Sequence, residues 1–203
     1  MTLSRYDRDR DGLCDQPECV DVLALVEATS LTSIGADEVA DRLEAIGIEL
    51  RTDPEPFLRF YRQVADERRE IPLAMGWNWA QDYPNASTSL GVMFASSGIR
   101  TTASPNVSLL GATPAQLRGW GYEVTSVPSA DDRIDRCLAM VGLDQTECWA
   151  DLDRYLMEEV VPVVPFASTE STHVVSERVA SFSSSAATGE LALDRIALVP
   201  GSG

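Results

Sequence analysis

Acidic residues near the N-terminus have the spacing of a calcium-binding loop. In residues 7–18, DRDRDGLCDQPE, acids occupy the first, third, fifth, ninth and twelfth positions, and Gly12 is the sixth residue. A twelve-residue EF-hand loop has this pattern, because its glycine permits a sharp turn while side-chain oxygens and the carbonyl of the seventh residue converge on a hard cation. The pattern therefore predicts a Ca2+ site, with the ligands Asp7, Asp9, Asp11, Leu13, Asp15 and Glu18.

The flanks of this loop differ from those of an EF-hand. Too few residues precede Asp7 to form a helix, and a strand-like run follows Cys19. We therefore expect an isolated calcium loop, which a Cys14–Cys19 disulfide would close. The alternative interpretation is a solvated acidic loop that holds no metal.

A second candidate site lies in residues 71–85, IPLAMGWNWAQDYPN. The stretch begins as an apolar run typical of a buried strand, and then presents aromatic side chains and one acid before a Pro-Asn turn. A small-molecule pocket usually combines aromatic walls with a few placed polar groups. The pattern predicts a ligand-binding surface formed by Trp77, Trp79, Asp82 and Tyr83. Alternatively, both indoles belong to the core and the acid caps a turn.

Composition excludes several other functions. The chain has 203 residues, with 16 basic and 32 acidic ones and a net charge of -16, which argues against nucleic acid and anionic membranes as partners. Every basic residue is arginine, so a phosphate-loop lysine and a Schiff-base lysine are excluded. His173 is the single histidine and lies in a strand-like stretch, where we expect a structural or surface role. A metal site built from two histidines cannot exist.

Four cysteines form two local pairs, Cys14 with Cys19 and Cys137 with Cys148. Close pairs in an even number predict two disulfides and an exported protein. The alternative is four buried thiols in a cytosolic protein. The polar N-terminus does not have the pattern of a signal peptide, so an exported protein would be a mature form or a truncated chain.

The residues around the second site predict alternating strands and helices. Apolar runs at 20–27, 48–50 and 71–77 are typical of short strands, and helical spacing separates them. This order predicts a parallel sheet with right-handed crossovers. Ligands of open α/β sheets bind outside the carboxyl ends of the strands, which is where Trp77 and Trp79 lie in this sequence.

Cap and stop residues predict where the first helices begin and end. Ser33 would cap the first helix and Gly47 would end it. Asp53 would cap the second helix and Pro54 would open it. Its buried face would consist of Phe57, Phe60, Tyr61 and Val64.

Two further helices are predicted in the C-terminal half. Ser129 would cap one of them, and Asp144 with Glu147 would form a capping box at the start of the next. Cys137 and Cys148 would link these two helices into a hairpin.

The remaining segments predict little regular structure. Residues 85–130 are irregular apart from a short helix over 114–120. Residues 160–166, VVPVVPF, contain two prolines and predict an edge or crossover strand, because proline cannot serve a central ladder. Residues 191–200 predict a final strand.

Several of these segments resemble the family 5 solute-binding proteins of ABC transporters, the peptide/nickel-binding type. The similar segments are IGIELRT after a helix, GWNWAQDYPN, the hairpin DDRIDRCLAMVGLDQTECWADLDRYLMEEVVPVVP and the closing strands. The likeness runs from about Tyr6 to Pro200 and concerns the C-terminal part of the family. The opening is similar to an Asp-rich, Cys-containing insert of some actinobacterial members.

This resemblance implies an α/β fold, a periplasmic-binding-protein-like lobe of the type II solute-binding proteins with a mixed sheet and an incomplete second lobe. Family members are longer, so we expect a C-terminal fragment whose missing portion holds the first lobe, half of the cleft and a lipid anchor. The expected division is an acidic Cys-containing loop at 1–19, an α/β lobe with the ligand-facing turn at 20–128, and a helical hairpin with returning strands at 129–203.

The resemblance also implies a function. It predicts an extracellular solute-binding component of an ABC importer, which would bind an oligopeptide at the outer face of the cell membrane and deliver it to ABC permease subunits. In peptide-binding relatives, a tryptophan and the aspartate three residues later line the pocket, and the aspartate pairs with the peptide α-amino group. These positions are Trp79 and Asp82. The following Pro84 and Asn85 depart from the family pattern of an acid and a proline.

Two alternatives remain open at this point. The chain could be a standalone secreted calcium-binding or adhesion module whose functional site is the loop at 7–18. It could also be a hydrolase with paired carboxylates. No carboxylate pair in the sequence has the support of a motif, so the sequence argues against an enzyme.

Overall fold

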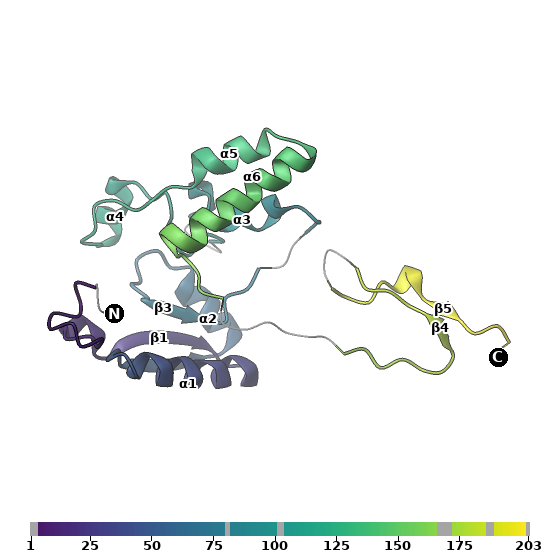
Figure 1. Ribbon diagram of the computed structural model, residues 1–203, viewed down its shortest axis with the longest axis horizontal. Helices are drawn as coiled ribbons and strands as arrows, with labels where there is room; N and C mark the ends of the chain where they lie inside the picture. Colours follow the sequence, from purple (N-terminus) through teal and green to yellow (C-terminus); the bar gives the residue numbers. More distant parts are fainter. Residues whose placement is uncertain (1–3, 80–81, 101–103, 166–171, 186–188, 202–203) are drawn as a thin grey trace.

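Figure 1 shows the computed structural model, which describes residues 4–79, 82–100, 104–165, 172–185 and 189–201. Three parts follow one another along the chain: an α/β part at residues 22–77, a helical part at residues 85–160, and a two-stranded arm that projects away from both. The acidic N-terminal loop precedes the α/β part and ends in a short 3-10 helix, η1 (Pro17–Cys19).

The α/β part contains a parallel sheet of three strands, in the order β2-β1-β3. The strands are β1 (Val22–Glu27), β2 (Leu50–Glu55) and β3 (Leu73–Met75). Two helices connect them, α1 (Ser30–Glu44) and α2 (Phe57–Val64). The central strand β1 pairs with a strand on both sides. Its Ala24, Leu25 and Val26 are buried, and Val26 belongs to a core cluster with Ala36 of α1. The predicted order of strands and helices is therefore confirmed.

Two predicted helix starts are wrong. The first helix is capped by Thr29, whose hydroxyl accepts the Thr32 N–H at 3.4 Å, and Ser33 lies inside that helix. The expected cap Asp53 and opener Pro54 belong instead to β2, and Pro56 precedes α2. Pro54 is tolerated inside β2 because β2 is an edge strand and pairs with β1 alone.

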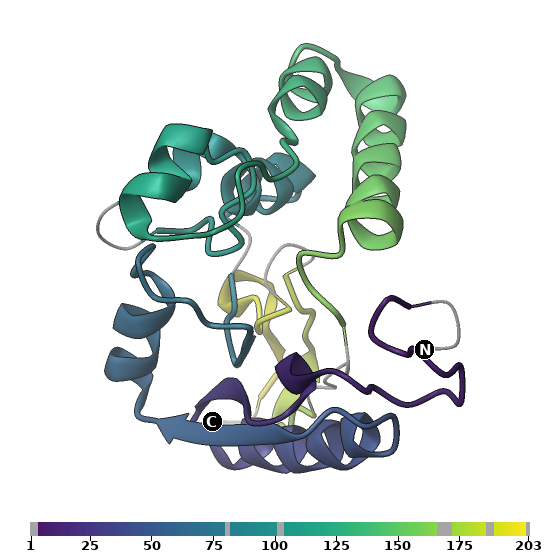
Figure 2. The ribbon, with the colours of Figure 1, turned by 90° about the vertical axis from the view of Figure 1, so that its left-hand side faces the viewer.

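The helical part lies on the opposite side of the sheet from α1, as Figures 1 and 2 both show. Its core contains Phe94, Ile134, Trp149, Leu152 and Leu156, all of them nearly inaccessible to solvent. The elements are η2 (Ala86–Thr88), α3 (Leu90–Met93), η3 (Ser96–Gly98), α4 (Pro114–Trp120), α5 (Asp131–Leu138), α6 (Gly142–Tyr155) and the π-helix η4 (Leu156–Val160).

The helices α5 and α6 form the predicted hairpin. A disulfide joins Cys137 and Cys148, whose Cα atoms are 5.4 Å apart. The expected capping box is wrong, because α6 begins at Gly142 and Asp144 already lies in its first turn. The Ser129 hydroxyl accepts the Asp131 N–H at 3.1 Å, but Ala130 is the residue at the N-cap of α5, so the predicted cap is wrong by one residue.

The chain directly after the helical part, over the described residues 161–165, is not a strand. The π-helix ends at Val160, and Val161 has a left-handed backbone with φ 53°. Residues 161–165 form no strand ladder, so the expected edge or crossover strand is wrong over these residues; Phe166 lies outside the described residues. Pro162 and Pro165 each lack the N–H that a ladder requires.

The arm contains two short antiparallel strands, β4 (Val179–Ser181) and β5 (Ala197–Leu198), with η5 (Leu193–Arg195) just before β5. The expected final strand is thus confirmed in a shorter form. Strands of both orientations occur in the chain, but in two separate sheets rather than in one mixed sheet. His173 is exposed, with its ring centroid 6.4 Å from that of Phe182. Within the described ranges, no helix has the length and apolar character needed to cross a membrane.

Candidate functional site

A cleft of about 1070 Å³ lies between the α/β part and the helical part. Residues of β3, the end of α2 and the loop after it line one side. The opposite side comes from the end of α3, from residues 104–109 and 122–124, and from residues 161–164. The lining is mostly apolar, and it includes Met75, Trp77 and Phe94. The cleft is therefore bounded by segments that are distant in sequence.

Trp77 reaches the cleft through a turn that only glycine fits. Gly76 follows β3 with φ +107°, and a Cβ atom on it would lie 2.5 Å from the Cβ of Glu27. The absence of that Cβ lets the chain leave β3 closely against the end of β1. Trp77 comes next and lines the cleft.

The Trp77 indole has a polar group that no described residue satisfies. Its ring lies beside Tyr61, with 4.8 Å between ring centroids, and the Tyr61 hydroxyl accepts the Asn78 N–H at 3.3 Å. The indole Nε1 is buried and has no hydrogen-bond partner among the described residues. Buried donors are usually paired. This N–H is thus a buried donor, close to the cleft, that the fold leaves unpaired.

One end of the cleft is acidic. Asp66, Glu67 and Glu70 line it together with a single cation, Arg69. Tyr122 lies beside them, and its hydroxyl donates to the Arg69 carbonyl at 3.4 Å. Burial raises the pKa of Tyr122, and the three nearby carboxylates raise this pKa further. The cleft therefore combines apolar walls with a negative potential that favours a cationic guest.

A fully buried asparagine shapes the opposite wall. Asn106 Nδ2 donates to the carbonyls of Ala95 and Leu110 at 2.9 and 3.0 Å, and its Oδ1 accepts the Ser108 hydroxyl at 2.9 Å. Ser104 donates to the Gly98 carbonyl at 2.9 Å. These bonds hold an irregular loop in one position, so this wall needs no regular secondary structure.

The other aromatic residues predicted at this site lie outside the cleft lining. Trp79 is 39% exposed, and its indole N–H donates to the Thr88 carbonyl at 2.7 Å. Tyr83 is 54% exposed, with its hydroxyl 3.1 Å from that of Ser87.

Asp82 is exposed and does not line this cleft either. Of the four predicted ligand-binding residues, the structure places Trp77 in the cleft with acids that the sequence had not singled out. The pairing of Asp82 with a ligand stays a prediction. The two residues between Trp79 and Asp82 lie outside the described ranges.

In the N-terminal loop, the structure brings three of the predicted calcium ligands together. Carboxylate oxygens of Asp7, Asp9 and Asp15 lie within 4.8 Å of one another. Asp11 and Glu18 are exposed and outside this group, and the Asp11 carboxylate accepts the Leu13 N–H at 2.8 Å.

The loop is closed as the cysteine spacing predicts. A disulfide joins Cys14 to Cys19, with 6.3 Å between Cα atoms. Within the described part of the chain no cysteine is free, so the alternative of four thiols does not hold.

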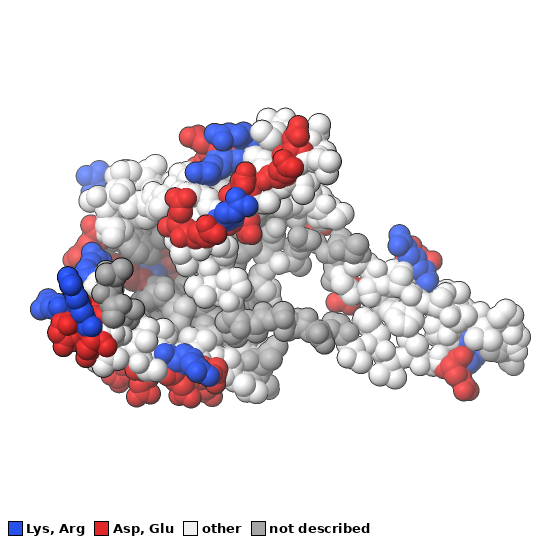
Figure 3. All heavy atoms as spheres, in the orientation of Figure 1, with Lys and Arg blue, Asp and Glu red and all other residues white. Residues whose placement is uncertain are grey.

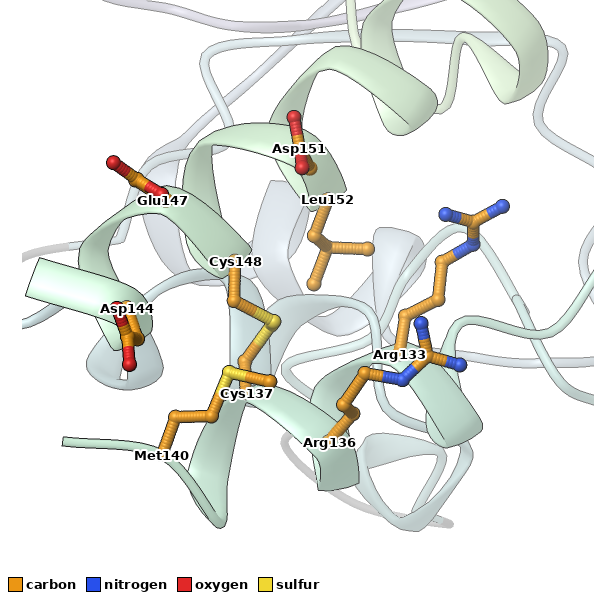
Figure 4. A pocket seen from close by; sticks show the side chains of 9 residues that line it. All are labelled: Arg133, Arg136, Cys137, Met140, Asp144, Glu147, Cys148, Asp151 and Leu152. Atoms are coloured by element: carbon orange, nitrogen blue, oxygen red, sulfur yellow. A yellow bond between two sulfur atoms is a disulfide. The ribbon is translucent and has the colours of Figure 1, made fainter.

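A smaller pocket of about 430 Å³ lies on the helical hairpin (Figure 4). The Arg133 and Arg136 side chains lie on one side of it, across the disulfide from the acids of α6. The Arg133 guanidinium is 4.0 Å from the centroid of the Tyr155 ring. Charged residues of both signs, Arg133 and Arg136 with Asp144, Glu147 and Asp151, line this pocket, which is typical of a solvated helix face rather than of a charge-selective site.

Charged side chains are unevenly distributed over the face in Figure 3. They gather over α5 and α6, along α1 and around the N-terminal loop. The arm is mostly uncharged on this face, and several of its apolar side chains, such as Val174 and Leu193, are highly exposed.

The fold is similar to that of a solved oligopeptide-binding protein. The structure of clavulanic acid biosynthesis oligopeptide binding protein 2 matches with a TM-score of 0.68 and 18% sequence identity. The match covers 88% of this chain and 30% of that protein, so the chain spans less than a third of its length. At this identity the likeness shows the fold: an α/β chain with a small parallel sheet and helices, arranged as in part of that protein.

No protein-family model matches the chain, and a comparison with curated protein sequences finds no match. The structural likeness agrees with the α/β fold that the resemblance predicts. Membership of family 5 and the similarity to actinobacterial members stay predictions.

Proposed function

We propose that the chain is the peptide-binding part of an extracellular solute-binding protein that serves an ABC importer. Its fold resembles part of an oligopeptide-binding protein, and its two disulfides are typical of exported proteins. Transport, the permease partner and the location at the outer face of the cell membrane belong to this proposal. The chain spans 30% of the similar protein, so the proposed role is one wall of a larger binding site.

The cleft beside β3 is the observation that carries the proposal. Its volume of about 1070 Å³ suits a ligand at the upper end of the size range of ordinary pockets, such as a short peptide. The apolar walls would cover peptide side chains of varied shape, which is what a carrier of many sequences requires.

Two polar features of the cleft match the constant parts of a peptide. The acids at 66–70 would attract the terminal ammonium group through their negative charge, although Asp66 and Glu70 are exposed and Glu67 alone is buried. The unpaired Trp77 N–H, which is buried in the free chain, would donate to a peptide carbonyl after a shift of the indole. Both interactions involve groups that every free peptide has.

The resemblance to peptide-binding relatives offers a second place for the ammonium group, Asp82 beside Trp79. In the structure both residues are exposed, and neither lines the cleft. The two possibilities can be distinguished. If the ammonium group binds in the cleft, neutralising Glu70 would weaken binding more, and if it binds beside Trp79, neutralising Asp82 would weaken binding more.

Calorimetric titration of the oxidised chain with trialanine and with N-acetyl-trialanine tests the proposal. We expect trialanine to bind with a Kd of about a millimolar, because a single wall buries only part of the ligand. Acetylation removes the ammonium charge and should weaken binding at least about tenfold. Failure of both peptides to bind, or equal binding of the two, would count against this function.

Matched variants identify the carboxylate. Glu70→Gln should weaken trialanine binding, whereas Glu44→Gln, an exposed acid at the end of α1, should not. Asp82→Asn tests the position implied by the resemblance, with Asp41→Asn as its control. A loss confined to Asp82→Asn would move the ammonium site away from the cleft.

A further inference from the structure

Three carboxylates meet in the N-terminal loop without a cation from the protein. The oxygens of Asp7, Asp9 and Asp15 lie within 4.8 Å of one another. Among the described residues, none of the three forms an ion pair with an arginine. Like charges this close repel, so the arrangement is costly unless a positive charge lies between them.

Asp7 is the unusual member of this group. Only 4% of the residue is exposed, although aspartate is rarely buried without a partner. Its Oδ2 accepts the Gly12 N–H at 3.1 Å. Its Oδ1 is buried and has no hydrogen-bond partner among the described residues. One oxygen of this buried carboxylate belongs to the group of three, and a buried charge of this kind calls for a cation as its partner.

The geometry points to a Ca2+ site formed by Asp7, Asp9 and Asp15. Calcium takes oxygen ligands at roughly 2.3–2.6 Å, so two ligands on opposite sides of one ion are about 4.6–5.2 Å apart. The three oxygens lie within 4.8 Å of one another, so they are close enough to share one such ion. All the offered atoms are carboxylate oxygens, and both nearby cysteines are in a disulfide, which excludes a zinc site of thiolates.

The loop is already held in the shape that such a site needs. The Asp15 N–H donates to the Tyr6 carbonyl at 2.8 Å, which brings the end of the loop to its beginning. The Cys14 N–H donates to the Ile46 carbonyl at 2.9 Å, and a Cβ on Gly47 would lie 2.7 Å from the Cys14 nitrogen. The loop therefore rests on the segment after α1, and the ion would fix it there.

The site differs from a complete EF-hand. Three carboxylates bind the ion, and because Asp9 and Asp15 are exposed, water completes the coordination. Fewer protein ligands mean weaker binding, in the range of roughly 10⁻⁴–10⁻³ M that is typical of extracellular calcium modules. This site serves to stabilise the loop and is independent of peptide binding in the cleft.

Calorimetric titration with CaCl2 of the oxidised chain, stripped of metal beforehand, tests this inference. We expect one Ca2+ per chain, with Mg2+ binding at least about tenfold more weakly. Asp9→Asn and Asp15→Asn should each weaken Ca2+ binding at least about tenfold. Both residues are exposed, so these variants retain the fold, which far-UV circular dichroism would verify.

Asp37→Asn is the control, because it removes the same charge from an exposed position on α1. It should bind Ca2+ within about twofold of the unchanged chain, since a distant charge acts only through the screened field. Asp7→Asn should abolish binding. The inference is overturned if the unchanged chain does not bind Ca2+ below about 10 mM, or if Asp9→Asn binds as well as Asp37→Asn.

Discussion

The ring of Tyr61 lies against the indole of Trp77, with 4.8 Å between their centroids and 39° between their planes. This contact joins α2 to the chain that leaves β3, and it fixes the aromatic wall of the cleft. Phe57 and Phe60 extend the aromatic group, with centroids 4.6 and 5.4 Å from that of Tyr61. Phe60 is fully buried, so Trp77 is backed by the core of the α/β part; Phe57 is 55% exposed, and its predicted place on the buried face of α2 is wrong.

We expect Trp77→Ala to destabilise the fold by about 2 kcal/mol, because it removes a partly buried indole and the contact of that indole with the Tyr61 ring. Trp79→Ala should cost about 1 kcal/mol or less, because Trp79 is 39% exposed. Urea unfolding followed by circular dichroism measures both values. A larger loss for Trp79→Ala would show that the exposed indole, and not Trp77, supports the core.

The turn after β3 gives a sharp test of backbone geometry. Gly76→Ala should destabilise by about 2–4 kcal/mol, since Gly76 has φ +107° and an added Cβ would collide with Glu27. Gly119→Ala is the matched control. Gly119 lies inside α4 with open space around it, so alanine there should be neutral or stabilising by up to about 1 kcal/mol. Thermal unfolding of both variants compares them, and equal losses would refute the steric explanation.

The third prediction concerns acid stability. Burial acts to raise the pKa of Asp131, but hydrogen bonds from the Ser96 N–H and the Ser129 hydroxyl outweigh it and hold this pKa below its ordinary value. The ionised form is therefore favoured in the folded state. Its contribution to stability is complete above the unfolded pKa of about 3.9 and is lost as pH falls through the lower folded pKa.

Asp131→Asn should accordingly lower the free energy of unfolding by about 1 kcal/mol at neutral pH. The difference from the unchanged chain should shrink below about pH 4. Asp132→Asn removes the neighbouring exposed acid of α5 and should show a smaller effect. Unfolding curves between about pH 2 and 7 measure this; a difference that stays constant over the range would exclude the ionised carboxylate as its cause.

Local patterns in the sequence predict most of the α/β part, because its strands and helices are short and consecutive. The short apolar run of β1 is typical of a buried strand, and the spacing of Phe57, Phe60 and Tyr61 is typical of a helix. Two of the errors concern strands, at Asp53-Pro54 and at residues 160–165. There the conformation depends on whether a neighbouring strand exists, and a local pattern does not contain that information.

The cleft was only partly predictable for a related reason. Trp77 follows a recognisable strand, so its place at the carboxyl edge of the sheet could be inferred. The acids at 66–70 line the cleft because the helical part packs across from them, which depends on contacts between distant segments. In the N-terminal loop, alternating acids bring Asp7 and Asp9 together, but the loop has no flanking EF-hand helices, and Glu18 lies outside the group.

Each disulfide closes a short loop within one part of the molecule, Cys14–Cys19 before the sheet and Cys137–Cys148 within the hairpin. In the described chain, no covalent bridge other than the polypeptide itself connects the two walls of the cleft. Oxidation therefore leaves the walls able to change their separation, and a guest could enter or leave without any thiol chemistry.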